Sequence, residues 1–483
     1  MKRSLCILAL LAVVTTGCTR LTDGGEAIVN HMITIDREGN YIPIEHGGEV
    51  IDTRLGEKIY QRQLQGDCAT TAPYLEHLKQ LFAAIEASQK TDILIFIHGG
   101  LNTLNGCFER IIEQHREIQK NEGPYPIFIN WRSGAVSTYW DHLVHIRQGA
   151  VSDWAPLTAP LYAATDLAGS LVNAFKAWTV TGEHAWRTTL GRNRREAGSP
   201  VEENKMLERM AQENDDIFFT GNQRQHFDTF PRSLLWGVTA PAKLVTTPFV
   251  YTLARPAWDV MLRRSKLLVN KPAEFDYESP NNCGEPRKIP SGSGALAVFM
   301  EKLGGPEGFL ERCKAKGRPM SMTLIAHSMG TIVAGEILKS FPDIYFKNIV
   351  FMGAAISTRD AVSSLGTYLM RHRSPPADFY NLSLHPENED REISGFGLIP
   401  SGSLLAWIDN MYTTPETRID RTFGRWDNIK FARFLFPEAV RDQMHYKIFG
   451  MAGGKNAPYP QKHGEFDEVR FAYWKPIFWW HEP

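Results

Sequence analysis

One stretch, from Met320 to Leu338, constrains the fold more than any other part of the chain. An apolar run stops at Ala326, a polar turn follows around Ser328, and apolar residues then recur at helical spacing. This order predicts a strand, a sharp turn and a helix. A turn this tight exposes one side chain and leaves room only for small residues two positions before and two positions after it. Ala326 and Gly330 meet that requirement around Ser328.

The sequence of this turn, Ala326-His-Ser328-Met-Gly330, resembles the Gly-x-Ser-x-Gly nucleophile turn of the α/β-hydrolase family, with alanine replacing the first glycine. The resemblance implies an α/β fold with a mostly parallel central sheet flanked by helices. It also implies that Ser328 is the catalytic nucleophile. Because amides at the start of a helix lie beside such a hydroxyl, the amide of Met329 is an expected oxyanion donor.

A second segment resembling this family follows an unbroken apolar run at 93–97, which is typical of a central strand covered on both faces. The sequence His98-Gly99-Gly100 is similar to the loop after the third strand of α/β-hydrolases. Glycines at this point let backbone amides approach a substrate carbonyl. The resemblance therefore implies a second oxyanion donor at Gly100 or Leu101, and a bracing role for His98.

The acid of the expected catalytic triad should follow the strand predicted at 379–384, where the loop is rich in carboxylates. Asp390 best matches the Asp-Arg-x-aliphatic ending of related esterases, and Glu387 and Glu389 are the alternatives. A buried carboxylate in this role would accept the Nδ1 proton of the catalytic histidine and fix its tautomer.

The histidine should follow the last strand, predicted at 444–449. His463 lies in the loop after that strand and is the expected general base, while His445 lies within the strand and is the alternative. The resulting order of Ser328, Asp390 and His463 is the order of the triad in this family.

The N-terminus resembles a bacterial lipoprotein signal, with Lys2, Arg3 and a ten-residue apolar run before Cys18. Thr15 stands where that family prefers an aliphatic residue, so a plain secretory signal is the alternative. The resemblance implies export, cleavage before Cys18 and anchoring by acyl chains on that cysteine. Thr19, in place of aspartate, implies sorting to the outer membrane of the bacterial envelope.

About 190 residues separate the strand predicted at 126–130 from the strand that leads to Ser328, far more than an ordinary loop. Two apolar portions of this insertion, 154–180 and 234–262, contain prolines and charges that argue against membrane spans. They are expected to form either the core of a helical cap or a lid that meets acyl chains or the bilayer surface. The charged stretch 191–216 between them predicts a solvated helix.

The expected organisation follows from these segments. It comprises a signal peptide (1–17), a lipid-anchored tether (18–30), the first part of an α/β-hydrolase core (31–138), a mainly helical cap or lid insertion (139–290) and the second part of the core (291–483). A hairpin is predicted at 32–44, helices at 73–88, 107–120 and 294–316, a further strand at 348–352, and a closing helix or strap at 471–480.

Composition narrows the function further. The net charge of −1 gives no long-range field favouring nucleic acid. No His or Cys cluster has zinc spacing, and Gly450 to Asn456 lacks the spacing of a phosphate loop, so neither a metal nor another cofactor is expected. Four cysteines remain beyond Cys18 (Cys68, Cys107, Cys283 and Cys313), and disulfides between them are possible in an exported protein.

The sequence therefore predicts a serine hydrolase that cleaves a carboxylic ester through an acyl-serine intermediate. The apolar insertion favours a lipid or acyl ester as substrate, and the acylated Cys18 would place the protein on a membrane surface. An acyltransferase using the same triad is one alternative. A non-catalytic envelope-binding protein that retains the fold is another.

Overall fold

The computed structural model describes residues 19–20, 25–42, 49–50, 68–100, 104–186, 200–222, 229–271, 293–392, 400–453 and 456–480. The predicted signal peptide, the acylation site at Cys18 and the proposed oxyanion donor Leu101 lie outside these residues. Cys283 also lies outside them, whereas Cys313 is a buried free thiol.

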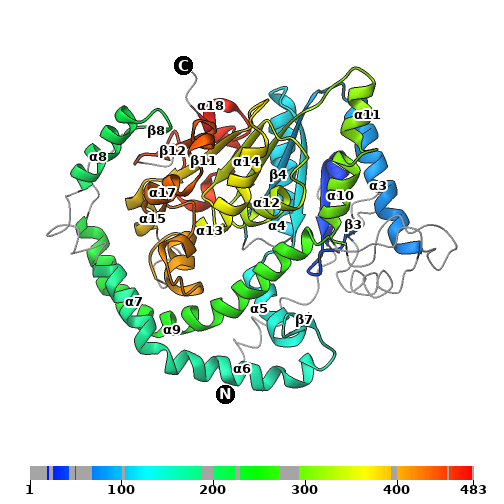
Figure 1. The fold of residues 1–483 in the computed structure, drawn as a ribbon. Coiled ribbons are helices and arrows are strands. Elements are labelled where there is room, and N and C mark those ends of the chain that lie inside the picture. Colours follow the sequence, from blue (N-terminus) through cyan, green and yellow to red (C-terminus); the bar gives the residue numbers. More distant parts are fainter. Residues whose placement is uncertain are drawn as a thin grey trace. The chain divides into compact units, whose positions relative to one another are not determined.

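A mostly parallel sheet of eight strands, with helices beside it, forms the centre of the fold (Figure 1). Its strand order is β2-β5-β4-β9-β10-β11-β12-β8. The strands are β2 (Met32–Ile35), β4 (Asp92–Ile97), β5 (Tyr125–Trp131), β8 (Ile217–Phe219), β9 (Ser321–His327), β10 (Asn348–Met352), β11 (Asp378–Leu384) and β12 (Met444–Phe449). Pairing is parallel between β2 and β5, β9 and β10, β10 and β11, β11 and β12, and β12 and β8. The predicted α/β class with a mostly parallel sheet is therefore confirmed.

Apolar runs in the sequence account for these strands. β10 and β12 have the predicted bounds, and β4, β5 and β11 begin and end within one residue of the predicted ones. The side chains of β5 are buried along its whole length, as are those of β4 from Ile93 to Ile97, as expected of strands covered on both faces. β8 was not predicted, because three residues carry too little pattern to separate a strand from a loop.

The chain divides into two compact units. The first comprises Met1–Ile95, Leu101–Ser137 and Arg264–Met320, and the second comprises Phe96–Gly100, Thr138–Arg263 and Ser321–Pro483. The predicted insertion at 139–290 therefore contributes residues to both units.

The first unit contains helices on an apolar core. Its helices are η1 (Gly25–His31), α3 (Cys68–Ala87), α4 (Leu104–Lys120), α10 (Ala295–Gly304) and α11 (Phe309–Ala315), and β1 (Thr19–Arg20) pairs with β3 (Glu49–Val50). The ring of Phe82 on α3 stacks on Phe309 of α11, with ring centroids 4.8 Å apart. The predicted hairpin is present as a tight turn after β2, where Ile35 bridges Tyr41 in antiparallel fashion. Only its residues up to Ile42 are described.

The second unit holds the strands from β8 to β12 and most of the helices. Its longer helices are α6 (Ala155–Val172), α7 (Ala174–Trp186), α8 (Pro200–Glu213) and α12 (Gly330–Ser340), while α5 (Ala135–Val144) and α9 (Thr229–Leu268) each contain a boundary between the units. Shorter elements are β6 (Ile146–Arg147), β7 (Ala150–Val151), α13 (Thr358–Ala361), η3 (Val362–Gly366), α14 (Thr367–Arg371), α15 (Pro386–Arg391), α16 (Leu404–Trp407), η5 (Ile408–Tyr412), η6 (Arg418–Asp420), α17 (Trp426–Ala432), η7 (Arg433–Leu435), η8 (Glu438–Gln443), η9 (His463–Glu465), η10 (Val469–Phe471) and α18 (Pro476–Trp479).

The apolar portions of the predicted insertion form the helices α6, α7 and α9, and its charged portion contains α8. Several prolines of these portions lie inside continuous helices, Pro160 in α6 and Pro241, Pro248 and Pro256 in α9. Within the described ranges, none of the helices has both the length and the hydrophobicity required to span a bilayer.

Candidate active site

Ser328 lies on the sharp turn that the sequence predicts. β9 ends at His327 and α12 begins at Gly330, so the turn between them is only two residues long. The backbone φ of Ser328 is +52°, a region that residues other than glycine seldom occupy. Hydrogen bonds to both backbone groups of Ser328 hold this conformation: its amide donates to the Met352 carbonyl (2.9 Å), and its carbonyl accepts from the Ala355 amide (3.2 Å) and from the amide and hydroxyl of Thr331 (3.1 and 2.6 Å). Such conformations persist where the surroundings over-determine them, and they are concentrated at functional sites.

Close packing explains the glycine after the turn. A Cβ atom on Gly330 would overlap the carbonyl oxygen of Ile97 at the end of β4. Only glycine therefore allows α12 to start this close to the neighbouring strand. The sequence analysis expected a small residue at position 330, and the close approach of the β4 backbone is the reason.

The loop Gly99–Gly100 runs directly beside the serine. A Cβ atom on Gly99 would come within 2.9 Å of the Cβ of Ser328, and one on Gly100 would overlap the sulfur of Met329. Two of the three expected oxyanion donors, Gly100 and Met329, therefore lie together next to Ser328. The imidazole Nδ1 of His98 lies 2.6 Å from the Gly99 carbonyl oxygen, so this ring contacts the loop, in keeping with a bracing role.

His463 contacts the serine directly. Its Nε2 lies 2.8 Å from Oγ of Ser328, and both residues are buried, with exposed fractions of 5% and 2%. His463 begins the short helix η9 in the segment after β12, and Gly353 leaves room for its ring, because a Cβ there would lie 3.0 Å from the imidazole. His445 lies elsewhere, stacked on Tyr380 with ring centroids 4.9 Å apart. The structure thus brings His463, and not His445, to Ser328.

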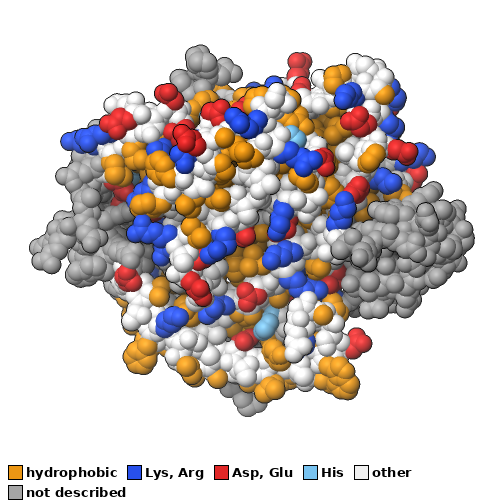
Figure 2. Space-filling view, in the orientation of Figure 1, with side chains coloured by type: hydrophobic (Ala, Val, Ile, Leu, Met, Phe, Trp, Pro, Cys, Tyr) orange, Lys and Arg blue, Asp and Glu red, His pale blue; other side chains and the backbone are white. Residues whose placement is uncertain are grey.

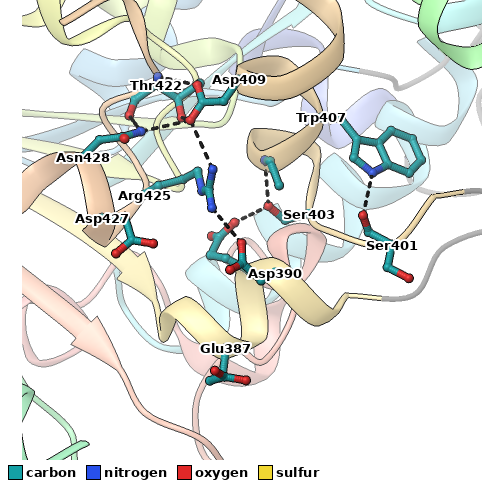
Figure 3. A network of polar contacts seen from close by, with 12 residues as sticks. Glu387, Asp390, Ser401, Ser403, Trp407, Asp409, Thr422, Arg425, Asp427 and Asn428 are labelled. Atoms are coloured by element: carbon teal, nitrogen blue, oxygen red, sulfur yellow. Dashed lines mark hydrogen bonds and ion pairs between the residues drawn. The ribbon is translucent and has the colours of Figure 1, made fainter. Parts of the chain in front are cut away.

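Asp390 does not occupy the position predicted for it. Its Oδ1 accepts a hydrogen bond of 2.7 Å from Nη2 of Arg425, and the same guanidinium reaches Oδ2 of Asp409 at 3.3 Å (Figure 3). Nδ1 of His463 makes no hydrogen bond to any described residue. Asp390 is therefore not hydrogen-bonded to His463 in this structure, and the predicted pairing of these two residues is wrong. Its carboxylate is instead directed to a buried cation, which offers a stronger electrostatic partner than a neutral ring.

Neither of the two alternative acids is hydrogen-bonded to Nδ1 of His463. The carboxylate of Glu389 is bonded to the hydroxyl of Ser403, and burial raises its pKa to about 8 against the opposing effects of this bond and of Arg425. Glu387 is fully buried, and its side chain lies apart from the network of Arg425 in Figure 3.

Glu392 is the carboxylate that the structure places on His463, and the sequence did not single it out. Its Oε2 accepts a hydrogen bond of 2.9 Å from the backbone amide of His463. Burial raises the pKa of this carboxyl above its ordinary value, and the hydrogen bond from His463 opposes the rise. Glu392 directly follows α15 and ends the acidic run that lies in that helix, and nothing in its spacing distinguishes it from the acids before it.

A second buried imidazole, that of His327, contacts the backbone of His463. Nε2 of His327 lies 2.9 Å from the carbonyl oxygen of His463, and the two rings are 5.2 Å apart. Nδ1 of His327 lies 3.8 Å from a carboxylate oxygen of Asp467. Burial, with a smaller contribution from His327, holds the pKa of His463 well below its usual 6.5. The ring is therefore neutral at pH 7, the state that a general base requires.

This shift predicts the pH dependence of any reaction in which His463 acts as the base. We expect kcat/KM for an ester to remain constant as the pH falls through 6.5 and to decline only at lower pH, because His463 stays neutral there. Stability should behave differently. The unfolded state takes up a proton on this histidine below pH 6.5 and the folded state does not, so His463 lowers stability as the pH falls through that value. A pH-rate profile with a midpoint at or above 6.5 would contradict the expectation.

Among the described residues, no group of three or more His, Cys, Asp and Glu side chains is arranged to hold a metal ion. Compared with protein-family models, curated proteins and solved structures, the chain gives no significant match. Proposals about its function therefore depend on the geometry of this site.

Proposed function

We propose that the protein is a serine hydrolase of the α/β-hydrolase type that cleaves a carboxylic ester, with a lipid or acyl ester favoured. One observation supports this most directly. A buried serine with φ of +52° lies between a strand and a helix, with its hydroxyl 2.8 Å from the imidazole of His463 and a glycine loop beside it. Nucleophile, base and oxyanion loop are the three parts that acyl transfer through serine needs.

The chemistry follows from these positions. Nε2 of His463 takes the proton from Oγ of Ser328 as Oγ attacks the ester carbonyl carbon. The negative charge that develops on the carbonyl oxygen is stabilised by amides at Gly100 and Met329. The intermediate collapses to the acyl-serine, and the departing alkoxide takes the proton from His463. Water, deprotonated by the same imidazole, then releases the acid and restores Ser328.

Acyl transfer to an alcohol is the second candidate, because Ser328 and His463 are almost wholly buried. A site that excludes water protects an acyl-enzyme from hydrolysis and favours another acceptor. Product analysis with and without an alcohol acceptor distinguishes the two reactions.

Location on the bacterial envelope through an acylated Cys18 belongs to the same proposal, and it is tested by radiolabelled palmitate incorporation into the wild-type chain and into Cys18→Ala.

A fluorophosphonate probe tests the proposal as a whole. Its phosphorus reacts with an activated serine, so we expect labelling of the native chain and at least a hundredfold less labelling of Ser328→Ala. Because Ser328 is 2% exposed, the assay should include detergent micelles or vesicles that give the probe access. Equal labelling of both chains, or none under any of these conditions, would favour the alternative of a non-catalytic binding protein.

We infer further that Glu392 is the acid that orients His463 during catalysis. Its Oε2 already accepts from the backbone amide of His463, so this carboxylate is bonded to the residue whose Nδ1 lacks a hydrogen-bond partner among the described residues. Glutamine keeps an oxygen for the backbone bond but offers no negative charge to the imidazolium. Glu392→Gln should therefore lower kcat by about 10³-fold or more, with a small change in KM.

Asp390→Asn is the matched control, because it removes the same charge from the acid predicted by the sequence. We expect its kcat to stay within about fivefold of the wild type, since Asp390 contacts Arg425 and not His463. A steady-state comparison of the two variants on one soluble ester decides the assignment. The reverse order of effects would return the acid role to Asp390.

A further inference from the structure

Helix α6 and the start of α7 turn their apolar side outward. The exposed residues from Trp154 to Phe175 are Trp154, Pro156, Leu157, Pro160, Leu161, Ala164, Thr165, Leu167, Ala168, Leu171, Val172 and Phe175. We call these residues the outward apolar face. Hydrophobic side chains line the lower part of Figure 2, where Figure 1 places α6. Within this face, Leu157, Leu161, Leu171 and Phe175 keep the spacing of one side of a helix.

Most polar side chains of α6, Thr165 excepted, point into the protein instead. Asp166 accepts a hydrogen bond of 2.9 Å from the hydroxyl of Tyr139, and Thr158 accepts one of 2.8 Å from Nε of Arg147. Ser170 is completely buried. A surface helix in water normally has the opposite arrangement, with its apolar stripe towards the core.

The middle of α9 repeats this inversion. Its exposed side chains between 238 and 249 are Val238, Pro241, Leu244, Val245 and Phe249. Thr239, Lys243 and Thr247 of the same turns are buried. A hydrogen bond of 2.7 Å from Nε1 of Trp178 to the carbonyl of Leu244 joins α7 to this part of α9. Two neighbouring segments of one unit thus have their polar residues inside, which burial in a protein core does not explain.

We propose that the outward apolar face lies in the surface layer of a lipid bilayer. Between Asp153 and Lys176 no exposed residue of this face is charged, which matches the uncharged acyl region. Exposed aliphatic residues make up most of it, and it contains no Tyr, Met or Arg and only two of the aromatic residues in which protein interfaces are enriched, Trp154 and Phe175. Trp154, with 72% of its surface exposed, and Lys176 stand at its two ends, where aromatic rings and long amines reach the headgroups.

The chain outside the described residues supports the same occupant. Residues 1–18 carry the lipoprotein-like signal, whose acylated cysteine would hold the protein at a membrane. Helix α6 is 18 residues long, which corresponds to about 27 Å, so it offers an extended strip to a surface beneath it. Binding of this face to a bilayer does not require catalysis at Ser328.

Vesicle flotation of the full chain tests this face. The assay uses Cys18→Ala, which removes the acylation site, and vesicles of phosphatidylethanolamine and phosphatidylglycerol. The double change Leu161→Asp and Leu171→Asp alters residues that are 65% and 70% exposed, so it leaves the core intact. We expect it to lower the vesicle partition coefficient at least about tenfold, because aspartate is strongly disfavoured among acyl chains.

The double change Leu435→Asp and Ile477→Asp is the matched control, since these side chains are 49% and 63% exposed, lie in the same unit and receive the same two charges. Its partition coefficient should stay within twofold of the parent, and all three chains keep the same N-terminus. Equal thermal unfolding midpoints verify that each variant is folded. Unchanged flotation of the variant at Leu161 and Leu171 would overturn the proposal. So would a dimer in sedimentation velocity that this variant dissociates, because a second copy would then occupy the face.

Discussion

Replacing His463 with alanine is expected to lower kcat for ester hydrolysis by about 10⁴- to 10⁶-fold, the largest effect of any substitution considered for this protein. The reason lies in the single contact of 2.8 Å between Nε2 of His463 and Oγ of Ser328. A serine hydroxyl is a weak nucleophile without a base to take its proton. In the described part of the chain, His463 is the only side chain recorded at hydrogen-bond distance from that oxygen.

Alanine also leaves a cavity at a buried position, so loss of activity alone could reflect loss of fold. His463→Gln fills the space but has no nitrogen that accepts a proton at neutral pH, and it should lose activity to a similar degree. His445→Gln tests the alternative base and should keep kcat within about threefold. Rates on a chromogenic ester, read beside thermal unfolding midpoints, decide the matter. More than a tenth of the wild-type rate in a folded His463→Gln would refute the role of this histidine.

Local pattern was sufficient to predict the strand-turn-helix around Ser328 and the segment that carries His463. The apolar strand, the small residues at 326 and 330 and the helical repeat all constrain the same few residues, so they predict one geometry. Chain order then placed the base after the last strand, and His463 lies in the segment after β12. The turn and the chain order both follow from residues that are close in sequence. They can therefore be predicted without the structure.

The acid depended on information that the sequence lacks. Asp390, Glu389 and Glu392 lie within three residues of one another, at the end of the one-turn helix α15 or just after it. Each meets a different partner that is distant in sequence: Asp390 meets Arg425, Glu389 meets Ser403, and Glu392 meets the backbone amide of His463. Helix orientation has the same limitation. Apolar content predicted the helices of the insertion, but not that α6 places its apolar side outward.

Replacing Arg425 with methionine is expected to lower the free energy of unfolding by about 3–5 kcal/mol at pH 7, the largest loss of stability expected from a single substitution in the second unit. This guanidinium is 8% exposed and lies between the carboxylates of Asp390 and Asp409, at 2.7 and 3.3 Å. Methionine fills much of the volume but leaves both acids buried without the cation. Asp409 keeps bonds from the amide of Thr422 (2.8 Å) and from Asn428 (3.0 Å), which limit the loss.

Urea unfolding measures this loss, with Arg359→Met as the matched control. Arg359 binds Asp420 at 2.7 Å, but its side chain is 57% exposed, so its removal should cost at most about 1 kcal/mol.

The pH dependence of the stability loss supplies a second test. A buried acid without its cation has a raised pKa, so its penalty is present at pH 7 and fades as the pH falls towards 4, where the unfolded chain also binds the proton. The deficit of Arg425→Met should therefore shrink between pH 7 and pH 4, and adding Asp390→Asn should recover part of it at pH 7. If Arg425→Met loses no more stability than Arg359→Met, the prediction is wrong. The other hydrogen bonds of this network would then be sufficient to stabilise the two carboxylates without the Arg425 guanidinium.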